Sequence, residues 1–278
     1  MKLSIILAPY DSGRRDHGFG KGPEALISGG LVETLTMEGH DVAVEEIGSI
    51  KGLDDREIAT GFAVCKAVAE KVSAARKADR FPVVLAGNCL TACGSVAGEE
   101  ADSIIWFDQH ADINTPETSA HGFLDGMALA TALGLCWRPM AYTIHDFRPI
   151  EPAKSMLVGA RDLDPEEKVV LGSLPVIRAE MTDAAEKVAE LKAKDVKRTH
   201  MHIDLDVHDP DELQVNRYAQ SGGPTPVQVR DAATCMARSA PIVGLTLTAY
   251  DPAFDAKSEV PPVVGHLLVD FLAAMEQA

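Results

Sequence analysis

Two segments of the chain place ligand-type side chains at every second position, each directly after a largely apolar run. The first set is Asp108, His110 and Asp112, and the second is Asp204 and Asp206. Because successive side chains of a strand alternate between its faces, the members of each set point the same way. Isolated buried charges are costly, so these carboxylates need a counter-charge, and a divalent cation is the simplest one.

Together the two sets hold four aspartates and one histidine, which is more acid than a single ion requires. Such a group suits two divalent ions bridged by carboxylate oxygens, with a hydroxide between them. Hard oxygen ligands with little histidine favour Mn(II) over Zn(II), so we predict two Mn(II) ions per chain. His202 lies one step deeper on the face that carries Asp204, and we expect it to pack behind the ligands rather than join them.

The elements that must position these residues alternate along the chain. Strands are predicted over 3–8, 41–46, 81–90, 104–108, 156–160, 175–177, 198–207 and 242–249, and helices over 24–39, 54–77, 91–100, 127–135, 181–194, 225–238 and 262–276. This alternation indicates a doubly wound, mostly parallel α/β sheet, in which ligands sit at the carboxyl ends of the strands. No linker composition or internal repeat interrupts it, so we predict one domain over 1–278.

Composition narrows the class of protein. A net charge of -16 over 278 residues argues against nucleic acid and anionic membranes as partners, and bound metal would neutralise part of it. Five cysteines, odd in number and without paired spacing, argue against a disulfide framework. The N-terminus reads as a strand rather than a signal peptide, and no apolar run reaches membrane-spanning length. We expect a cytoplasmic enzyme, and the sequence leaves oligomerisation open.

The metal motifs carry a family resemblance that spans nearly the whole chain. The segments that carry it, in matching order, are Gly22-Pro23, Asp108-x-His110-x-Asp112-Ile113-Asn114-Thr115-Pro116-Glu117-Thr118 with Gly126-Met127, Gly159-x-Arg161-Asp162-x-Asp164, Asp204-x-Asp206-x-x-Asp209-Pro210, Gly222-Gly223 and Asp251-Pro252. The sequence resembles the arginase/agmatinase ureohydrolases. The resemblance implies a three-layer α/β/α fold with an eight-stranded parallel sheet and two Mn(II) ions.

By the same resemblance, Asp108 and Asp204 would bridge both ions, Asp112 would complete one site, and His110 with Asp206 would complete the other. The implied reaction is hydrolysis of a linear C–N bond in a small guanidino compound by a metal-bridging hydroxide. Substrate contacts would come from Asn114, His121, Asp164 and Asp251. An aspartate directly before a proline, as at Asp164, is equally typical of a helix cap.

Three departures from the family pattern bear on the substrate. Cys89 stands where the family places a histidine ligand; a thiolate is a competent ligand, with Asn88 as the weaker alternative and simple burial of a small apolar side chain as the third. Asp125 replaces a loop histidine thought to shuttle a proton, so Asp125 or His121 would move the proton to the leaving amine. Ala249 replaces the glutamate that holds the guanidinium, and Asp251 follows two residues later.

A cysteine ligand combined with loss of the loop histidine resembles the hydroxyarginase branch, which hydrolyses N-hydroxy-L-arginine to hydroxyurea and ornithine. We therefore predict a binuclear manganese hydrolase acting on a guanidino or N-hydroxyguanidino compound. Two alternatives stay open. One is a degenerate relative that binds a metal or metabolite without turnover, and the other is an amidohydrolase acting on a non-guanidine amide.

Overall fold

Eight parallel strands form one central sheet in the computed structural model, which describes residues 1–53 and 56–277. Their spatial order is β4-β1-β5-β10-β9-β6-β7-β8. The strands are β1 (Lys2–Ala8), β4 (Asp41–Glu46), β5 (Phe81–Ala86), β6 (Ser103–Phe107), β7 (Ser155–Val158), β8 (Ile177–Ala179), β9 (Thr199–Asp204) and β10 (Ile242–Thr248). The predicted parallel α/β sheet is confirmed.

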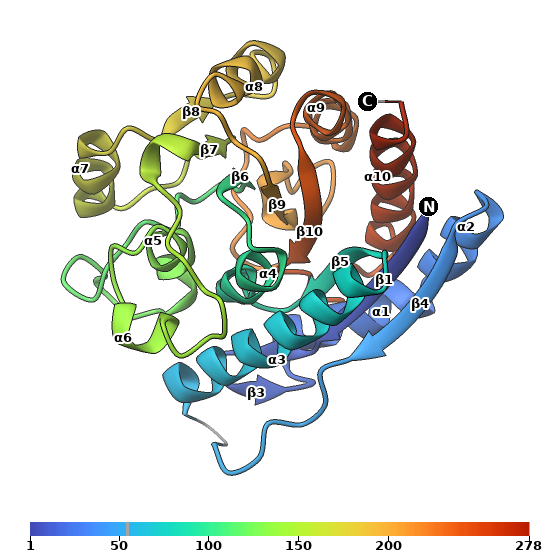
Figure 1. Cartoon of the computed structure of the whole chain (residues 1–278), viewed down its shortest axis with the longest axis horizontal. Helices are drawn as coiled ribbons and strands as arrows, with labels where there is room; N and C mark the ends of the chain where they lie inside the picture. The colour runs from blue at the N-terminus through green and yellow to red at the C-terminus, as the bar shows by residue number, and fades with distance from the viewer. Residues whose placement is uncertain (54–55, 278) are drawn as a thin grey trace.

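Helices cover both faces of this sheet and complete a three-layer α/β/α fold (Figure 1). One face carries α1 (Gly22–Ser28), α2 (Leu31–Met37), α8 (Ala184–Lys192), α9 (Pro226–Ser239) and α10 (Val260–Met275). The other carries α3 (Glu57–Lys77), α4 (Ala92–Glu99), α5 (Ala128–Ala132), α6 (Arg138–Ala141) and α7 (Pro165–Ser173). A small hairpin, β2 (Tyr10–Asp11) with β3 (Arg14–Arg15), lies apart from the sheet.

The central strands are apolar on both sides because helices bury both sides. In β6, Ile105 and Phe107 enter the core beneath α8–α10, while Ile104 and Trp106 enter the core beneath α3–α5, and all four are fully buried. Burying each such side chain contributes roughly 1.5–3 kcal/mol. This run therefore fixes where β6 ends, and with it the position of the polar residues that follow.

The structure differs from the predicted elements in several places. Strand β6 ends at Phe107, so Asp108, His110 and Asp112 lie in the loop that follows it rather than on one face of a strand. The predicted helix over 24–39 is two helices, because Gly30 adopts a left-handed φ of 92° that ends the first. The strand predicted over 198–207 ends at Asp204 and continues as a short 3-10 helix, η5 (Leu205–Val207). Helices α6 and α7 have no predicted counterparts. Of the helix predicted over 54–77, residues 54 and 55 lie outside the described residues.

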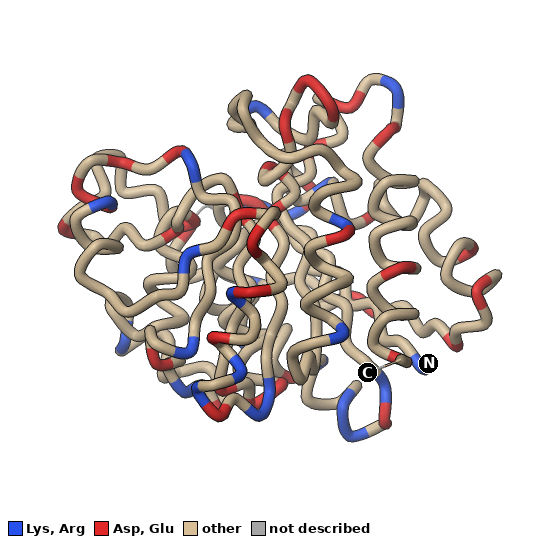
Figure 2. The backbone as a smooth tube through the Cα atoms, turned by 90° about the horizontal axis from the view of Figure 1, so that it is seen from above, with Lys and Arg blue, Asp and Glu red and all other residues tan. Residues whose placement is uncertain are grey.

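The surface shows mixed charge and closely placed chain ends. Lys and Arg positions are interspersed with Asp and Glu positions along the backbone (Figure 2). The amino group of Met1 lies 3.0 Å from Oε1 of Glu276, so both ends meet beside α10. Across the described parts of the chain, every helix is too short or too polar to cross a membrane.

Helices α3 and α4 pack so closely that Gly94 has no room for a side chain. A methyl group at Gly94 would collide with the backbone carbonyl oxygen of Cys65 in α3. Gly94→Ala should therefore lower the free energy of unfolding by about 1–3 kcal/mol in chemical denaturation, despite the better helix propensity of alanine. Gly172→Ala, in α7 where nothing lies within 4 Å, is the control and should be neutral or stabilising. Equal effects of the two substitutions would contradict this packing argument.

Candidate metal centre

Four neighbouring strand ends meet at one edge of the sheet. These strands lie in the order β5-β10-β9-β6. Cys89 follows the end of β5, Ala249 follows β10, Asp204 is the last residue of β9, and Asp108 follows β6. The parallel register makes the four carboxyl ends level, and a cavity of about 350 Å³ opens over them. The two polar sets, which are about 95 residues apart in the sequence, therefore lie side by side where such folds bind ligands.

The carboxylates in this cavity floor are almost fully buried. Asp108, Asp112, Asp204 and Asp206 are 0%, 5%, 4% and 2% exposed. His110 is the basic side chain placed against them, with Nδ1 at 3.3 Å from Asp108 Oδ1 and 3.6 Å from Asp206 Oδ2. Burial by itself lowers the pKa of His110, but the contact with Asp108 and the charge of Asp206 raise that pKa to about 10.

Two groups of possible ligand atoms, each contained within 4.8 Å, occur among the described residues. One consists of Asp108, His110 and Asp206, and the other of Cys89, Asp108 and His202. Asp108 belongs to both groups, which is the position that a bridging carboxylate would occupy. The structure thus brings four of the six predicted ligands into these groups.

The remaining two predicted ligands lie next to the groups rather than inside them. Asp204 accepts a hydrogen bond from Cys89 Sγ at 2.9 Å through Oδ2, and one from the Asp206 backbone nitrogen at 2.7 Å through Oδ1. Asp112 lines the same cavity, and its backbone takes a left-handed φ of 51° in the loop after β6. Asp112 and Asp204 as metal ligands stay predictions.

The electrostatics of this cluster show that it suits a cation. Burial, and then the neighbouring carboxylates, raise the pKa of Asp112 and that of Asp204 well above the usual range. Burial also raises the pKa of Asp206 to about 6. Within the described chain, Asp206 Oδ1 is buried without a hydrogen-bond partner, and the guanidinium of Arg161 donates to backbone carbonyls instead. A bound divalent ion would neutralise the carboxylates and occupy the unpaired oxygen.

Cys89 and Asn88, the two candidates for the missing histidine ligand, have different surroundings. The Asn88 side chain accepts a hydrogen bond from the Ser12 backbone nitrogen at 2.8 Å and donates one to Asp125 Oδ2 at 2.9 Å. Its polar atoms are therefore already used in holding the loop. The Cys89 sulfur instead belongs to a ligand group, and its pKa is raised by burial and by Asp204. The geometry favours Cys89 as the ligand.

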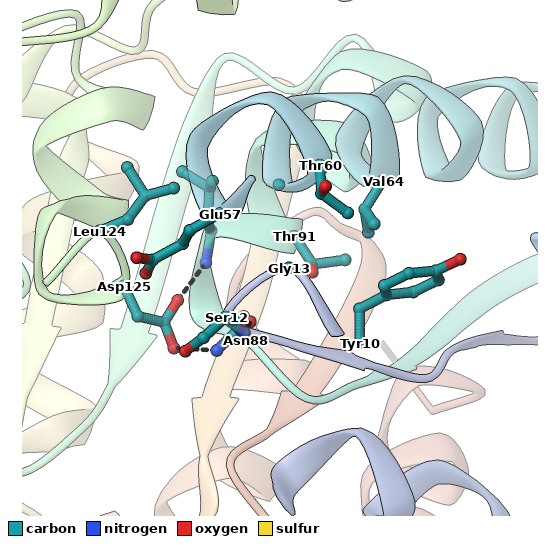
Figure 3. A pocket seen from close by; sticks show the side chains of 12 residues that line it. Tyr10, Ser12, Gly13, Glu57, Thr60, Val64, Asn88, Thr91, Leu124 and Asp125 are labelled. Atoms are coloured by element: carbon teal, nitrogen blue, oxygen red, sulfur yellow. Dashed lines mark hydrogen bonds between the residues drawn. The ribbon is translucent and has the colours of Figure 1, made fainter. Parts of the chain in front are cut away.

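Asp125 holds the turn that carries Cys89. One of its carboxylate oxygens accepts from Asn88, and the other accepts from the Leu90 backbone nitrogen at 2.9 Å, so Asp125 bonds the residues on either side of Cys89 (Figure 3). A small cavity lined by Glu57 and Tyr10 lies behind Asp125, which faces the metal cavity as well. Burial raises the pKa of Asp125 to about 7, whereas His121, the other predicted proton-transfer residue, is exposed at the cavity wall.

The residues predicted to bind substrate divide into two groups. Asn114, His121 and Asp164 line the cavity, and Asn114 Nδ2 donates to Asp164 Oδ2 at 3.1 Å. Asp164 is also the N-cap of α7, so both of its predicted roles are structurally possible. Asp251 is not among the described residues that line the cavity, and its carboxylate accepts from the Ala253 backbone nitrogen at 3.0 Å.

Several lining residues were not predicted, and Glu167 is the most deeply buried of them. Its two oxygens accept hydrogen bonds from the Ile113 and Asp164 backbone nitrogens at 3.0 and 3.2 Å, and so join the loop after β6 to the start of α7. An aspartate followed three residues later by a glutamate is the pattern of a capping box, which is the sequence signal that could have identified this residue. Phe19, Asp162 and Tyr218 also line the cavity.

Fold and site together define an open parallel α/β protein with an acidic, metal-competent centre at the carboxyl ends of its strands. A model of the arginase family matches residues 1–273, and the chain belongs to this family. It is 31% identical to the arginase of Bacillus caldovelox, with 96% of each chain covered. The crystal structure of arginase from Bacillus subtilis superposes with a TM-score of 0.87 at 26% identity over 98% of both chains. The agmatine ureohydrolase of Thermoplasma volcanium shares the fold, with a TM-score of 0.68 at 16% identity over 99% of this chain and 90% of that one.

The burial of Asp112 lowers the free energy of unfolding of the metal-free protein. Burial and the neighbouring carboxylates raise the pKa of Asp112, so folding disfavours the carboxylate form that the unfolded chain carries at pH 8, and Asp112 weakens the apoprotein at that pH. Asp112→Asn should raise the free energy of unfolding in EDTA at pH 8 by at least about 1 kcal/mol. The same variant should lose stabilisation by added Mn(II). Asp162→Asn, a half-exposed position in the same cavity, is the control; a destabilised Asp112→Asn apoprotein would contradict the argument.

Proposed function

We propose that this protein is a hydrolase that uses two divalent metal ions to cleave a linear C–N bond in a guanidino or N-hydroxyguanidino compound. The observation that carries the proposal is the sharing of Asp108 between two groups of ligand atoms in a member of the arginase family. When bound, the two ions, predicted to be Mn(II), would supply a hydroxide nucleophile at neutral pH.

The ligands in this proposal are Cys89, Asp108, His110, Asp112, Asp204 and Asp206. Cys89 and the four aspartates are buried, which keeps bulk water away and would strengthen their electrostatic contacts with bound ions. Backbone groups orient two of the carboxylates: the His110 nitrogen donates to Asp108 Oδ1 at 2.7 Å, and the Asp206 nitrogen donates to Asp204. These bonds hold the carboxylates in place before an ion arrives.

The cavity wall supports recognition of a small, polar, cationic substrate. Asn114, His121 and Asp164 lie on the wall, and Asp162 and Glu167 add further carboxylates. An amino group of the substrate would be attracted by Asp164, whose other contact is the neutral Asn114 amide. Proton transfer to the leaving amine is assigned to Asp125 or His121, since both face the cavity.

Ala249 favours an N-hydroxyguanidino substrate over a fully protonated guanidinium. It lines the cavity with a methyl group at the position where the family pattern has a glutamate. A protonated guanidinium placed there lacks its carboxylate partner, and charge-assisted hydrogen bonds are among the stronger ones. An N-hydroxyguanidine is less basic and depends less on that partner. The same methyl group also favours the second candidate, hydrolysis of a neutral non-guanidine amide.

The proposal is tested by metal-loaded turnover. Protein reconstituted with Mn(II) should release urea from guanidino compounds or hydroxyurea from N-hydroxyguanidino compounds, and Asp108→Asn should abolish that release. Formyl, acetyl and ureido compounds belong in the same panel and test the amide alternative. Binding of two ions per chain without turnover of any compound would overturn the proposal and indicate a binder of metal or metabolite.

A single substitution tests the role of position 249. Ala249→Glu should raise kcat/KM for guanidinium substrates relative to N-hydroxyguanidines by about 10- to 100-fold, because a hydrogen bond to a charged group contributes roughly 1.5–3 kcal/mol. Ala249→Gln has the same length without the charge and is the matched control. If glutamate and glutamine shift the substrate ratio equally, the missing carboxylate does not determine the preference.

A further inference from the structure

The two groups of ligand atoms in the metal centre are chemically unlike, although they share Asp108. The first, with His110 and Asp206, offers one nitrogen and carboxylate oxygens. The second, with Cys89 and His202, offers sulfur, nitrogen and oxygen. The sequence pattern alone places His202 behind the ligands, so its membership in this group is a finding of the structure.

His202 is fully buried and poorly satisfied. Its ring stacks on Trp106, with ring centroids 3.7 Å apart and an angle of 22° between the planes. Nδ1 has no hydrogen-bond partner within the described chain, and Nε2 has only a long 3.4 Å contact with Thr248 Oγ1. An unsatisfied buried polar atom is unfavourable by about 1–3 kcal/mol. A metal ion bound by the ring would give one of these two nitrogens a strong partner.

Cys89 and His202 approach each other through Thr248. The Cys89 sulfur lies 3.1 Å from Thr248 Oγ1, the same hydroxyl that contacts the His202 ring. The sulfur also donates to Asp204 Oδ2 at 2.9 Å, which places the second predicted bridging carboxylate beside this group. Trp106 completes the arrangement because its indole Nε1 donates to Asp108 Oδ2 at 3.1 Å while its ring supports His202.

We propose that Cys89, Asp108 and His202, with Asp204 beside them, form a metal position that prefers Zn(II) to Mn(II), whereas the His110 position keeps the oxygen-rich set. Thiolate, imidazole and carboxylate are the ligands of tetrahedral zinc sites, and soft thiolate ligands select against Mn(II). The inference rests on the proposed two-metal function and deepens it, because it makes the two ions unequal.

Metal competition is the first test. Because Zn(II) binds most N/O sites more tightly than Mn(II), the protein should be dialysed against Zn(II) with a large excess of Mn(II), and it should then retain one Zn(II) and one Mn(II) per chain in elemental analysis. Changes outside the coordination shell alone weaken metal affinity about 10- to 100-fold, so Cys89→Ser and His202→Phe should each weaken Zn(II) binding by at least about tenfold. His202→Phe keeps an aromatic ring against Trp106, and Cys93→Ser, another buried cysteine outside the group, is the control for sulfur.

Cobalt spectroscopy tests the two ligands directly and needs no turnover. The Co(II)-loaded protein should show a thiolate-to-cobalt charge-transfer band that Cys89→Ser abolishes and Cys93→Ser leaves unchanged. Its proton NMR spectrum should show two imidazole N–H signals displaced by the paramagnetic ion, from His110 and His202, and His202→Phe should remove one. If His202→Phe does not fold, the wild-type spectrum alone tests His202 as a ligand: two displaced imidazole signals support it, and one contradicts it.

The failure of this inference is distinct from failure of the proposed function. Absence of the charge-transfer band, a single displaced imidazole signal, or retention of Mn(II) without Zn(II) would overturn the inference while leaving hydrolysis intact. Conversely, a zinc-selective position in a protein that cleaves no compound of the panel would overturn the proposed function and leave the ligand assignment standing.

Discussion

Repulsion among four buried aspartates is the constraint on which the rest of this structure depends. Apolar strands and the helices on both faces of the sheet keep the carboxylates away from water, and His110 offsets only part of their charge. The strand order β5-β10-β9-β6 nevertheless places these residues together. A multivalent cation would offset this repulsion, so the order of the strands and the chemistry proposed for the site are connected.

Much of the fold and roughly half of the site could be predicted because their signals are local. Period-two spacing groups Asp108 with His110, and Asp204 with Asp206, but these pairs lie at the strand ends, where a backbone hydrogen bond to the first carboxylate holds each pair together. The position of His202 against Cys89 is different, since it arises from the pairing of four strands, including the register that sets Trp106 opposite His202. No spacing along one segment encodes that contact. The helix after β7 was missed because its only signal is a capping pattern.

The departures from the family pattern are physically connected. Asp125 bonds both neighbours of Cys89, so the replaced loop histidine and the replaced ligand belong to one hydrogen-bonded unit. Ala249 joins the same unit from the next strand, because its backbone nitrogen donates to Gly87 at 3.1 Å. Substitutions in such a unit are not expected to be additive. Cys89, Asp125 and Ala249 therefore belong to one connected part of the cavity that differs from the family pattern.

Trp106 has a consequence beyond packing. It is one of two tryptophans in the chain, is completely shielded from solvent, and touches both a carboxylate and an imidazole of the centre. Its excited state therefore senses any change in charge at Asp108 or in the electronic character of the stacked ring. The intrinsic fluorescence of Trp106 would therefore change when ions bind or leave, and it would follow both events in real time without an added dye.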